Sequence, residues 1–509
     1  SQVLASSAGL SVLAGGGNAV DAAVTAAAVL NVVEPHMTGI GGDMFAILWI
    51  EDEGALVGLD ASGRAGSEMT VEALRSLGHD AMPGSGAAAI TVPGALSGWA
   101  ALLERYGSIS LARALEPAIR MADEGFPVSP IIAEQWAAET EKLADDPGAR
   151  ATFLVEGRRA PGAGEWHRNP DLAATLRTIA EEGAGALYGG GLGRRIVDGI
   201  RERGGFLTLG DLRGHEPRWV EPISSEFRGY TVWELPPAGQ GIAALEILEI
   251  LEPFELAAMG HNSPDYLHHL IEAKKLAFAD LGRYVGDPRA MEIEPTALLD
   301  PEYVESRRRL IDPERAMTAP EPGVAATASE TIYLSAADRH GNMVSFINSI
   351  YSAFGSGVVV PGTGFALQNR GAGFTMEEGH PNRVAPGKRP FHTIIPAFVT
   401  RDGEPWLSFG VMGGSMQPQG HVQVLLNLLL FGMDLQEAID APRFRHLAGL
   451  RVGLEPPVGD GVREALRARG HDVVELHPYG AGGGQAVMRL EKGWAAGSDP
   501  RKDGAAAGH

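Results

Sequence analysis

The chain has no cysteine among its 509 residues. That absence excludes disulfide bonds, thiolate nucleophiles and cysteine-ligated zinc or iron–sulfur sites, although it fits any redox compartment. Long apolar runs are lacking too. The best candidate, residues 22–33, contains Thr25 and Asn31 and falls short of the roughly 18 residues that a membrane span needs. We therefore expect no membrane-spanning helix.

Positive charge is scarce as well. The 42 basic residues are outnumbered by 64 acidic ones, which gives a net charge of −22, and the only basic run is Arg307-Arg308-Arg309. Such a field repels phosphate backbones and anionic membranes, so neither nucleic acid nor a membrane is expected as a partner. The chain begins at Ser1 without a methionine or a charged-then-apolar leader. We expect a cytoplasmic protein, and a removed leader stays open.

The remaining composition, with 44% hydrophobic residues, 68 glycines and 33 prolines, is typical of a compact enzyme with many tight turns. Apolar periodicity predicts helices at residues 19–33, 96–128, 171–182, 193–204, 241–251, 264–281, 417–430 and 435–441. Strands are expected at residues 44–50, 331–336, 343–349, 365–367, 394–400, 406–410, 473–476 and 485–490. The fold class is therefore α/β, helix-rich before Thr331 and strand-rich after it.

Thr331 begins a predicted strand that turns at residues 338–342. Most threonines in such a place simply suit a strand, but one made N-terminal by cleavage carries a nucleophilic hydroxyl and its base together. Residues 320–328, just before it, are rich in Pro, Ala, Gly and Thr, as an exposed and cleavable connection would be. The glycine loop at residues 38–43 is not expected to bind phosphate, because it lacks a following Lys-Ser/Thr and precedes a strand.

Several short motifs share an order and spacing that can be compared with known families. They are Gly-Gly-Gly-Asn-Ala-Val-Asp-Ala-Ala at residues 15–23, Thr-Gly-Ile-Gly-Gly-Asp at 38–43, Val-Pro-Gly at 92–94, Pro-Pro at 236–237, Ala-Asp at 279–280, Gly-Asp-Pro at 286–288 and Ala-Pro-Arg-Phe at 441–444. Together they resemble the γ-glutamyltransferase family, a branch of the N-terminal-nucleophile hydrolases. The resemblance covers essentially the whole chain.

The resemblance implies a four-layer αββα sandwich, made as one precursor and cut between Glu330 and Thr331. A large subunit of residues 1–330 and a small subunit of residues 331–509 would remain together as a heterodimer, and a dimer of heterodimers is a further option. No cofactor and no metal are implied. The substrate class is a small-molecule amide, whose acyl group passes to water or, less often, to an amine.

Four residues match the family's catalytic machinery. The resemblance makes Thr331 the nucleophile, with its freed α-amino group accepting the hydroxyl proton, and makes Ser349 the hydroxyl that supports it. It assigns the backbone N–H groups of Gly413 and Gly414 to the oxyanion hole. Taken alone, Ser349 is an ordinary strand serine and the two glycines are a strand-to-helix turn.

The pocket that holds a γ-glutamyl group in the family differs here. Tyr351 replaces an asparagine, Gly373 replaces the carboxylate that binds the α-ammonium, and Arg370 replaces an acid or amide. An ammonium without its counter-ion loses a charge-assisted hydrogen bond of about 1.5–3 kcal/mol. We therefore expect this pocket to bind a free γ-glutamyl group weakly.

Further differences point the same way. The family's paired serines match His392-Thr393, and its carboxylate-binding arginine matches Ser62, with Arg64 two residues on. Arg370, His392 and Arg64 would make a pocket that is positive and free of an acid. Such a pocket prefers an acyl group that ends in a carboxylate and lacks an amine. The pattern resembles the family's amidohydrolase relatives, such as oxamate amidohydrolase and the glutaryl-cephalosporin acylases.

Other interpretations stay open. A true γ-glutamyltransferase acting on γ-glutamyl amides, or a non-catalytic member of the family, is compatible with the sequence. Arg370 can instead pair with a surface carboxylate, His392 can be a satisfied core histidine, and Arg64 can be solvated. A metal hydrolase would use His268, His269 and Glu272, but no third ligand is evident for His268 and Glu272, and a helix-surface pair is commoner.

Overall fold

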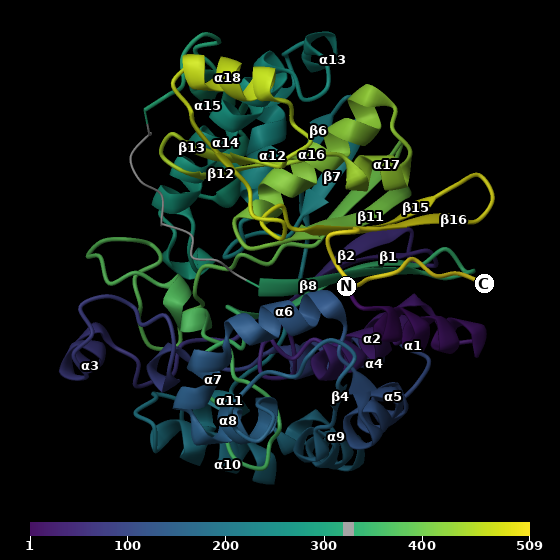
Figure 1. Ribbon diagram of the computed structural model, residues 1–509, viewed down its shortest axis with the longest axis vertical. Coiled ribbons are helices and arrows are strands. Elements are labelled where there is room, and N and C mark those ends of the chain that lie inside the picture. Colours follow the sequence, from purple (N-terminus) through teal and green to yellow (C-terminus); the bar gives the residue numbers. More distant parts are fainter. Residues whose placement is uncertain (319–329) are drawn as a thin grey trace.

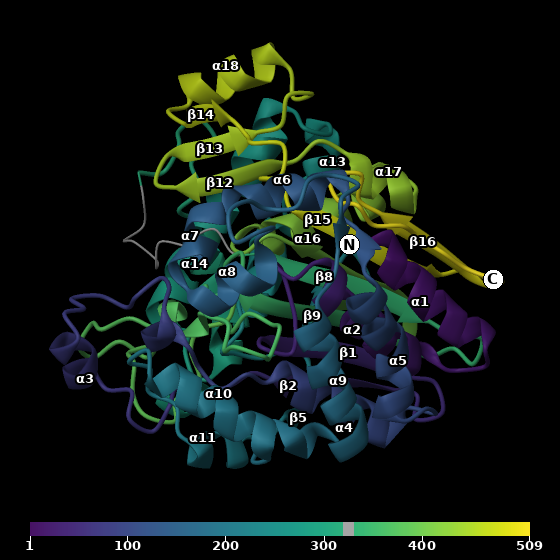
Figure 2. The same ribbon diagram turned by 60° about the horizontal axis from the view of Figure 1, so that its bottom comes forward.

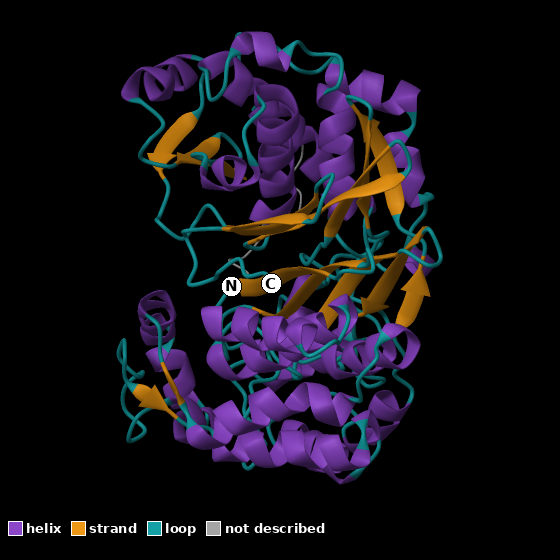
Figure 3. Cartoon of the chain, turned by 90° about the vertical axis from the view of Figure 1, so that its right-hand side faces the viewer, coloured by secondary structure: helices purple, strands orange, loops and turns teal. Residues whose placement is uncertain are grey.

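Two β-sheets face each other in the middle of the molecule, and helices cover the outer face of each (Figures 1 and 3). The computed structural model describes residues 1–318 and 330–509. The expected exposed connection at residues 320–328 lies outside the described residues. The layers run helix, sheet, sheet, helix, which confirms the predicted αββα sandwich.

The first sheet has five antiparallel strands in the order β5-β2-β1-β9-β8. They are β5 (Arg218–Val220), β2 (Ala55–Ala61), β1 (Asp43–Ile50), β9 (Met343–Tyr351) and β8 (Glu330–Ala337). Every residue of β1 and β9 is buried, because this sheet is covered on both faces. β8, which carries Thr331, lies at the edge of this sheet and has one neighbour among the described strands.

The second sheet has six strands in the order β16-β15-β11-β10-β7-β6. They are β16 (Trp494–Ser498), β15 (Gly483–Arg489), β11 (Glu404–Met412), β10 (Ala397–Arg401), β7 (Tyr230–Glu234) and β6 (Ile223–Phe227). A buried apolar cluster joins the inner faces of the two sheets, and it includes Phe45, Ile47, Tyr333, Ile347, Phe398 and Met412. Both sheets thus combine strands from before and after Thr331.

One helical layer packs on the first sheet. Its principal members are α1 (Val3–Ala14), α2 (Ala19–Val33), α4 (Ala95–Tyr106), α5 (Leu111–Glu124), α9 (Pro170–Glu182) and α10 (Gly191–Arg201). α2 is buried along its whole length and begins with a capping box between Asn18 and Asp21. Shorter helices of this half are α3 (Val71–Ser76), α6 (Pro130–Ala138), α7 (Thr140–Asp145), α8 (Pro147–Phe153) and α11 (Leu209–Arg213), with a two-stranded ribbon of β3 (Phe126–Pro127) and β4 (Trp166–His167).

The other helical layer packs on the second sheet. It contains α12 (Gly241–Leu251), α13 (Leu256–Met259), α14 (Pro264–Tyr284), α15 (Pro301–Arg308), α16 (Met416–Phe431) and α17 (Leu435–Asp440). A small sheet of β12 (Phe444–Ala448), β13 (Arg451–Leu454) and β14 (Asp472–Glu475) lies beyond it with α18 (Asp460–Ala468), at the top of Figure 2. No helix of the described residues is both long and apolar enough to cross a membrane.

Two expectations from periodicity are wrong. The helical pattern of residues 96–128 is not one helix, because the chain leaves α4 at Gly107 and re-enters helix only after the α5 N-cap, Ser110. Residues 365–367 are buried but form no strand. A short apolar run has no period of its own, so burial in an irregular segment and burial in a strand cannot be separated by pattern.

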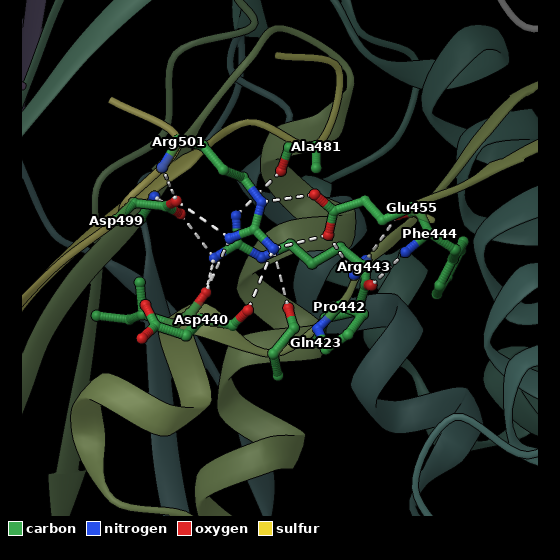
Figure 4. Close-up of polar contacts among 12 residues, drawn as sticks. Gln423, Asp440, Pro442, Arg443, Phe444, Glu455, Ala481, Asp499 and Arg501 are labelled. Carbon is green, nitrogen blue, oxygen red and sulfur yellow. Dashed lines mark hydrogen bonds and ion pairs between the residues drawn. The ribbon is translucent and has the colours of Figure 1, made fainter. Parts of the chain in front are cut away.

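A buried ion-pair network ties the end of the chain to the second sheet (Figure 4). The Arg443 guanidinium lies 2.8 Å from Asp499 and donates to the carbonyl oxygen of Ala481 over 3.0 Å. Arg501 bonds both Asp499 and Glu455. Because every charge in this network meets an opposite one, it fixes the turn at Ala481 firmly in place.

Candidate active site

Thr331 lies at an irregularity in the pairing of β8 with β9. Glu330 pairs with Tyr351, but Ile332 pairs with Asn348, so the register shifts across Thr331. Bulges of this kind turn a side chain out of the regular pleat and are common beside active sites. Thr331 is 1% exposed, and its hydroxyl donates to Ser349 Oγ over 3.3 Å.

Ser349 and Tyr351 form the other side of this irregularity. Ser349 Oγ accepts a hydrogen bond of 2.8 Å from the backbone N–H of Tyr351. Tyr351 has a φ of 80°, a left-handed conformation that is strained for a bulky residue and is found mainly where function requires it. The strained turn therefore holds the Ser349 hydroxyl at the Thr331 side chain.

The Gly413-Gly414 turn follows directly after β11 and leads into α16. Gly413 and Gly414 have φ values of 124° and 62°, a region that favours glycine. Their carbonyl oxygens accept from the first residues of α16, and among the turn and loop hydrogen bonds of the described residues none starts from either N–H group. A Cβ on Gly413 would lie 3.1 Å from the Cα of Gly482, which neighbours the Ala481 turn held by Arg443.

Contacts between the sheets bring this turn towards Thr331. Ser335 on β8 bonds Ser408 on β11, and the ring of Tyr333 packs on Gly410. Each step of two residues along β8 thus moves two residues along β11 in the opposite direction. β8 and β11 therefore face each other, and the start of β8 lies towards the end of β11, which the glycine turn follows.

Arg370 lies on the short helix η5 (Arg370–Gly373) and is completely buried. Its guanidinium donates to Thr393 Oγ1 over 3.0 Å and lies 4.5 Å from the centre of the Tyr351 ring. Gln240 in turn donates to the carbonyl oxygens of Thr393 and Gly414. A continuous set of contacts thus runs from Thr331 through the Tyr351 turn and Arg370 to the glycine turn.

Asp43 overturns the expectation of a pocket without an acid. It pairs with Ser349 across β1 and β9, so the two side chains share a face of the sheet. One carboxylate oxygen accepts from the N–H groups of Gly63 and Gly94 and from Gln368. The other lies 4.0 Å from Arg370 Nε and accepts no hydrogen bond within the described chain.

The protonation states in this pocket follow from its burial. Burial raises the pKa of Asp43 to about 7, although Arg370 opposes the shift. The His392 ring lies tilted against Phe45, with their ring centres 5.1 Å apart, and its Nε2 is 3.6 Å from Asp43 Oδ2. Burial, reinforced by Arg370, lowers the pKa of His392 well below its usual value, so the imidazole is neutral. Neither ring nitrogen has a hydrogen-bond partner among the described residues, so His392 is not a satisfied core histidine.

A second arginine, which the sequence did not single out, completes the pocket. Arg389 is 1% exposed, and its Nε donates over 3.1 Å to the hydroxyl of Ser62, the residue matched to the family's carboxylate-binding arginine. Asp60 lies 3.9 Å from Arg389 and is also bonded by Arg218. Arg389 stands only three positions before His392, and that spacing was the available signal.

The remaining predicted pocket residues lie further out. Arg64 donates to the carbonyl oxygen of Gly387 and lies 3.9 Å from Asp287, with 31% of its side chain exposed. Gly373 has no room for a side chain, because a Cβ there would meet the carbonyl oxygen of Phe391 at 2.7 Å. The missing acid at position 373 is therefore also a packing requirement of this chain.

The histidine cluster on α14 differs from expectation. His268 and Glu272 are buried, not on a helix surface, and His471 supplies a third potential ligand atom within 4.8 Å. The Glu272 carboxylate is already paired with Lys275 Nζ at 2.7 Å. His471 and His268 are bonded to each other at 2.9 Å. The charge that a metal would need is therefore already neutralised by a lysine.

Comparison with known proteins agrees with this geometry. The sequence pattern described as Gamma-glutamyltranspeptidase matches residues 5–509. The chain belongs to the γ-glutamyltranspeptidase family. As a member of that family it is an N-terminal-nucleophile hydrolase that acts on amides.

Individual members of the family resemble it over nearly their full length. The glutathione hydrolase-like YwrD proenzyme of Bacillus subtilis is 39% identical, over 99% of this chain and 97% of its own. The oxamate amidohydrolase proenzyme of Klebsiella pneumoniae is 38% identical with the same coverage. A crystal structure of cephalosporin acylase from Bacillus halodurans superposes with a TM-score of 0.94 and 46% identity, covering 100% of this chain and 95% of that one.

Proposed function

We propose that this family member is an autoprocessed amidohydrolase whose acyl group ends in a carboxylate and carries no α-ammonium. Cleavage between Glu330 and Thr331 would give Thr331 a free α-amino group. That amine accepts the hydroxyl proton as Thr331 Oγ1 attacks the amide carbon, the amine product leaves, and water hydrolyses the acyl-enzyme. Ser349 orients the Thr331 hydroxyl, and the N–H groups of Gly413 and Gly414 stabilise the oxyanion.

The observation that carries the acyl preference is a set of buried donors without acceptors. Arg370 Nε and Nη2 and Arg389 Nη1 are fully shielded and unbonded within the described chain, and so is the single N–H of the neutral His392, since neither of its ring nitrogens has a partner there. An unsatisfied buried donor costs about 1–3 kcal/mol, and more when it is charged. A substrate carboxylate satisfies several such donors at once, and guanidinium groups bind carboxylates in bidentate geometry.

The charge balance supports the same preference. Arg370, Arg389 and Arg218 face the carboxylates of Asp43 and Asp60, so the group is positive even with both acids ionised. With the pKa of Asp43 at about 7, part of the population holds that carboxyl protonated at neutral pH, which raises the positive charge further. An anionic acyl group is therefore favoured over a neutral one.

Asp43 also supports a second candidate, hydrolysis or transfer of γ-glutamyl groups. Its unbonded oxygen, Oδ2, is a possible partner for an α-ammonium, in place of the acid that Gly373 lacks. Arg370 competes for that oxygen at 4.0 Å and would repel the ammonium. We rank this candidate second because of that repulsion. The names of the relatives agree with either candidate, since they include glutathione hydrolase-like as well as oxamate amidohydrolase and cephalosporin acylase.

The test is a panel of amides given to the purified, processed protein, with Thr331→Ala as the blank. The panel contains glutaryl-4-nitroanilide, γ-glutamyl-4-nitroanilide, glutathione and oxamate. Turnover confined to the acids that lack an α-amine supports the proposal. Faster turnover of the γ-glutamyl compounds would replace it with the second candidate, and activity in the Thr331→Ala blank would remove the mechanism.

We also propose that residues 1–330 and 331–509 stay associated after cleavage. Both sheets contain strands from each part, so separating them would expose the apolar cluster between the sheets. Size-exclusion chromatography of the processed protein should give one peak that contains both pieces. A heavier peak would indicate a dimer of heterodimers.

A further inference from the structure

Residues 374–391 form a loop that leaves the acyl pocket and returns to it. The loop begins directly after η5, which carries Arg370, and it ends directly before His392. Its middle reaches the surface, where residues 377–379 are exposed. The two ends of the loop therefore lie at the pocket, and a contact between them affects how the two recognition groups lie relative to each other.

Asn382 joins the two ends of this loop through its side chain. It is 1% exposed, its amide nitrogen donates to the carbonyl oxygen of Gly373 over 2.6 Å, and its amide oxygen accepts from the backbone N–H of Phe391 over 2.9 Å. Gly373 is the last residue of η5, and Phe391 directly precedes His392. One side-chain amide thus bonds both sides of the pocket.

The two sides approach each other closely at Gly373. A Cβ there would lie 2.7 Å from the carbonyl oxygen of Phe391, so the approach requires a residue without a side chain. Arg370 makes a second link between the same sides, because its guanidinium donates to Thr393 Oγ1. That link uses the group proposed to bind the substrate. The link through Asn382 does not depend on that group.

Neighbouring contacts fix the orientation of Asn382. Its backbone N–H donates to His380 Nδ1 over 2.9 Å, and Nε2 of the same ring donates to the carbonyl oxygen of Gly282 over 2.7 Å. Gly282 belongs to α14, in the helical layer on the second sheet. The carbonyl oxygen of Asn382 accepts from the N–H of Thr375 over 3.1 Å. The loop is therefore anchored to a helix outside the pocket, which gives the side-chain amide a defined position.

We propose that Asn382 is a positioning residue, which holds Arg370 and His392 in the relative position that lets both bond one substrate carboxylate. It acts through Gly373 and Phe391 and needs no contact with the substrate. This inference rests on the proposed function, because it requires an acyl group that ends in a carboxylate. Bidentate binding of a carboxylate tolerates little displacement of the guanidinium. Loss of Asn382 should therefore weaken recognition of the carboxylate more than attack by Thr331.

The test compares the wild-type protein and Asn382→Ala on a matched pair of amides. One is glutaryl-4-nitroanilide, or oxamate if the panel above selects it, and the other has a carboxamide in place of the free carboxylate. We expect kcat/KM to fall about tenfold for the acid, mainly through KM, and less than about threefold for the carboxamide, because the cation is no longer held in place. In the Arg370→Gln background, Asn382→Ala should lower neither rate more than about twofold, since residues that act together are not additive.

Asn427→Ala is the matched control. Asn427 is 3% exposed and donates to the carbonyl oxygen of Ala438 over 3.1 Å, so its loss also removes a buried hydrogen bond. This variant should lower stability without changing the ratio of the two rates. Equal losses on both amides for Asn382→Ala, or an additive effect in the double variant, would overturn the inference and leave the proposed function intact. A wild-type protein that hydrolyses no amide of this kind would remove the proposed function, and the inference with it.

A second measurement covers an Asn382 variant that does not fold. In hydrogen exchange of the processed wild-type protein, saturating glutarate, or the acid that the panel selects, should slow exchange of peptides from residues 374–391 about threefold or more. The reason is that a carboxylate bonded to both Arg370 and His392 restrains both ends of the loop that Asn382 joins. Unchanged exchange in these peptides would contradict the inference.

Discussion

The proposed nucleophile region and the proposed acyl pocket are built in different ways. Thr331, Ser349 and Gly413 lie in or directly after strands of the two central sheets, and the hydroxyls of Thr331 and Ser349 are joined by a hydrogen bond. Arg370, His392 and Arg389 come from the long connection between β9 and β10, whose only regular element is η5. Several of their buried donors have no acceptor in the described chain.

Under the proposed function, this difference would separate the catalytic residues from the residues that select the substrate. Strand ends are fixed by many backbone hydrogen bonds and hold catalytic groups precisely, whereas connecting segments can change sequence without altering the core. Unbonded charged donors in a rigid, buried position are poor stabilising elements but good recognition elements. We therefore expect changes in the first region to abolish all turnover and changes in the second to alter which amides are cleaved.

The largest expected effect belongs to Thr331. Thr331→Ala should remain one chain on a denaturing gel and lose at least about 10⁴-fold in kcat/KM for every amide, since both nucleophile and base are gone. Thr231→Ala, a strand threonine of the second sheet, should be cut and active. If the Thr331→Ala chain is still cleaved into two pieces, or still hydrolyses an amide, the catalytic residues are not those at the strand ends.

Arg370 should show the next largest effect, confined to substrate choice. We expect Arg370→Gln to lower kcat/KM by about 10–100-fold for a glutaryl amide, but less than about threefold for the analogue with a terminal carboxamide. The variant also removes the charge that faces Asp43, so the double variant Asp43→Asn/Arg370→Gln is its control for folding. Similar losses of kcat/KM on both substrates would mean that Arg370 supports the protein structure and does not bind the substrate carboxylate.

Ser349 should have a smaller effect that does not depend on the substrate. Ser349→Ala removes the acceptor of the Thr331 hydroxyl and should lower kcat about tenfold with KM nearly unchanged, the size expected for one hydrogen bond. Ser349→Thr keeps the hydroxyl and should retain most activity. A change in KM alone would mean that Ser349 acts on binding, which would blur the distinction between the two regions.

The smallest expected effect is a dependence on pH. Because burial raises the pKa of Asp43 to about 7, the carboxyl is mostly protonated below that pH and ionised above it. Once ionised, it offsets the charge of Arg370, so competitive inhibition by glutarate should weaken about threefold between about pH 6.5 and about pH 8.5. Asp43→Asn keeps the acceptor for Gly63, Gly94 and Gln368 and should reduce this dependence. An unchanged profile in that variant would exclude Asp43 as its source.

The sequence predicted the layers and many elements well. Residues 19–33 and 241–251 form helices with the expected ends, because an apolar face and clear stop signals leave no alternative. Thr331, Ser349 and the two glycines could be aligned by motif since they lie in strands or directly after one. The glycine pair in particular needs positive φ values that few other residues tolerate.

The pocket was less predictable, for a physical reason. Asp43 sits next to Arg370 only because β1 lies beside β9, and the two residues are separated by more than 300 positions. Arg389 reaches Ser62 across a comparable gap. Pairings of this kind depend on where irregular segments pack against the sheet. No local pattern in the sequence indicates these packing positions. For the same reason, the sequence did not indicate that His471 lies beside His268.

The position of β8 at the edge of its sheet would have a mechanical consequence for the proposed cut at the start of this strand. Among the strands that the structure describes, only β9 is bonded to β8, and Glu330 forms the last pair before the proposed cut. If the pairing of Glu330 with Tyr351 is released, the rest of β8 stays paired with β9 and both sheets remain intact. The proposed cut would thus free the new end while the fold keeps its stability, and a single peptide bond would separate an inactive precursor from an active enzyme.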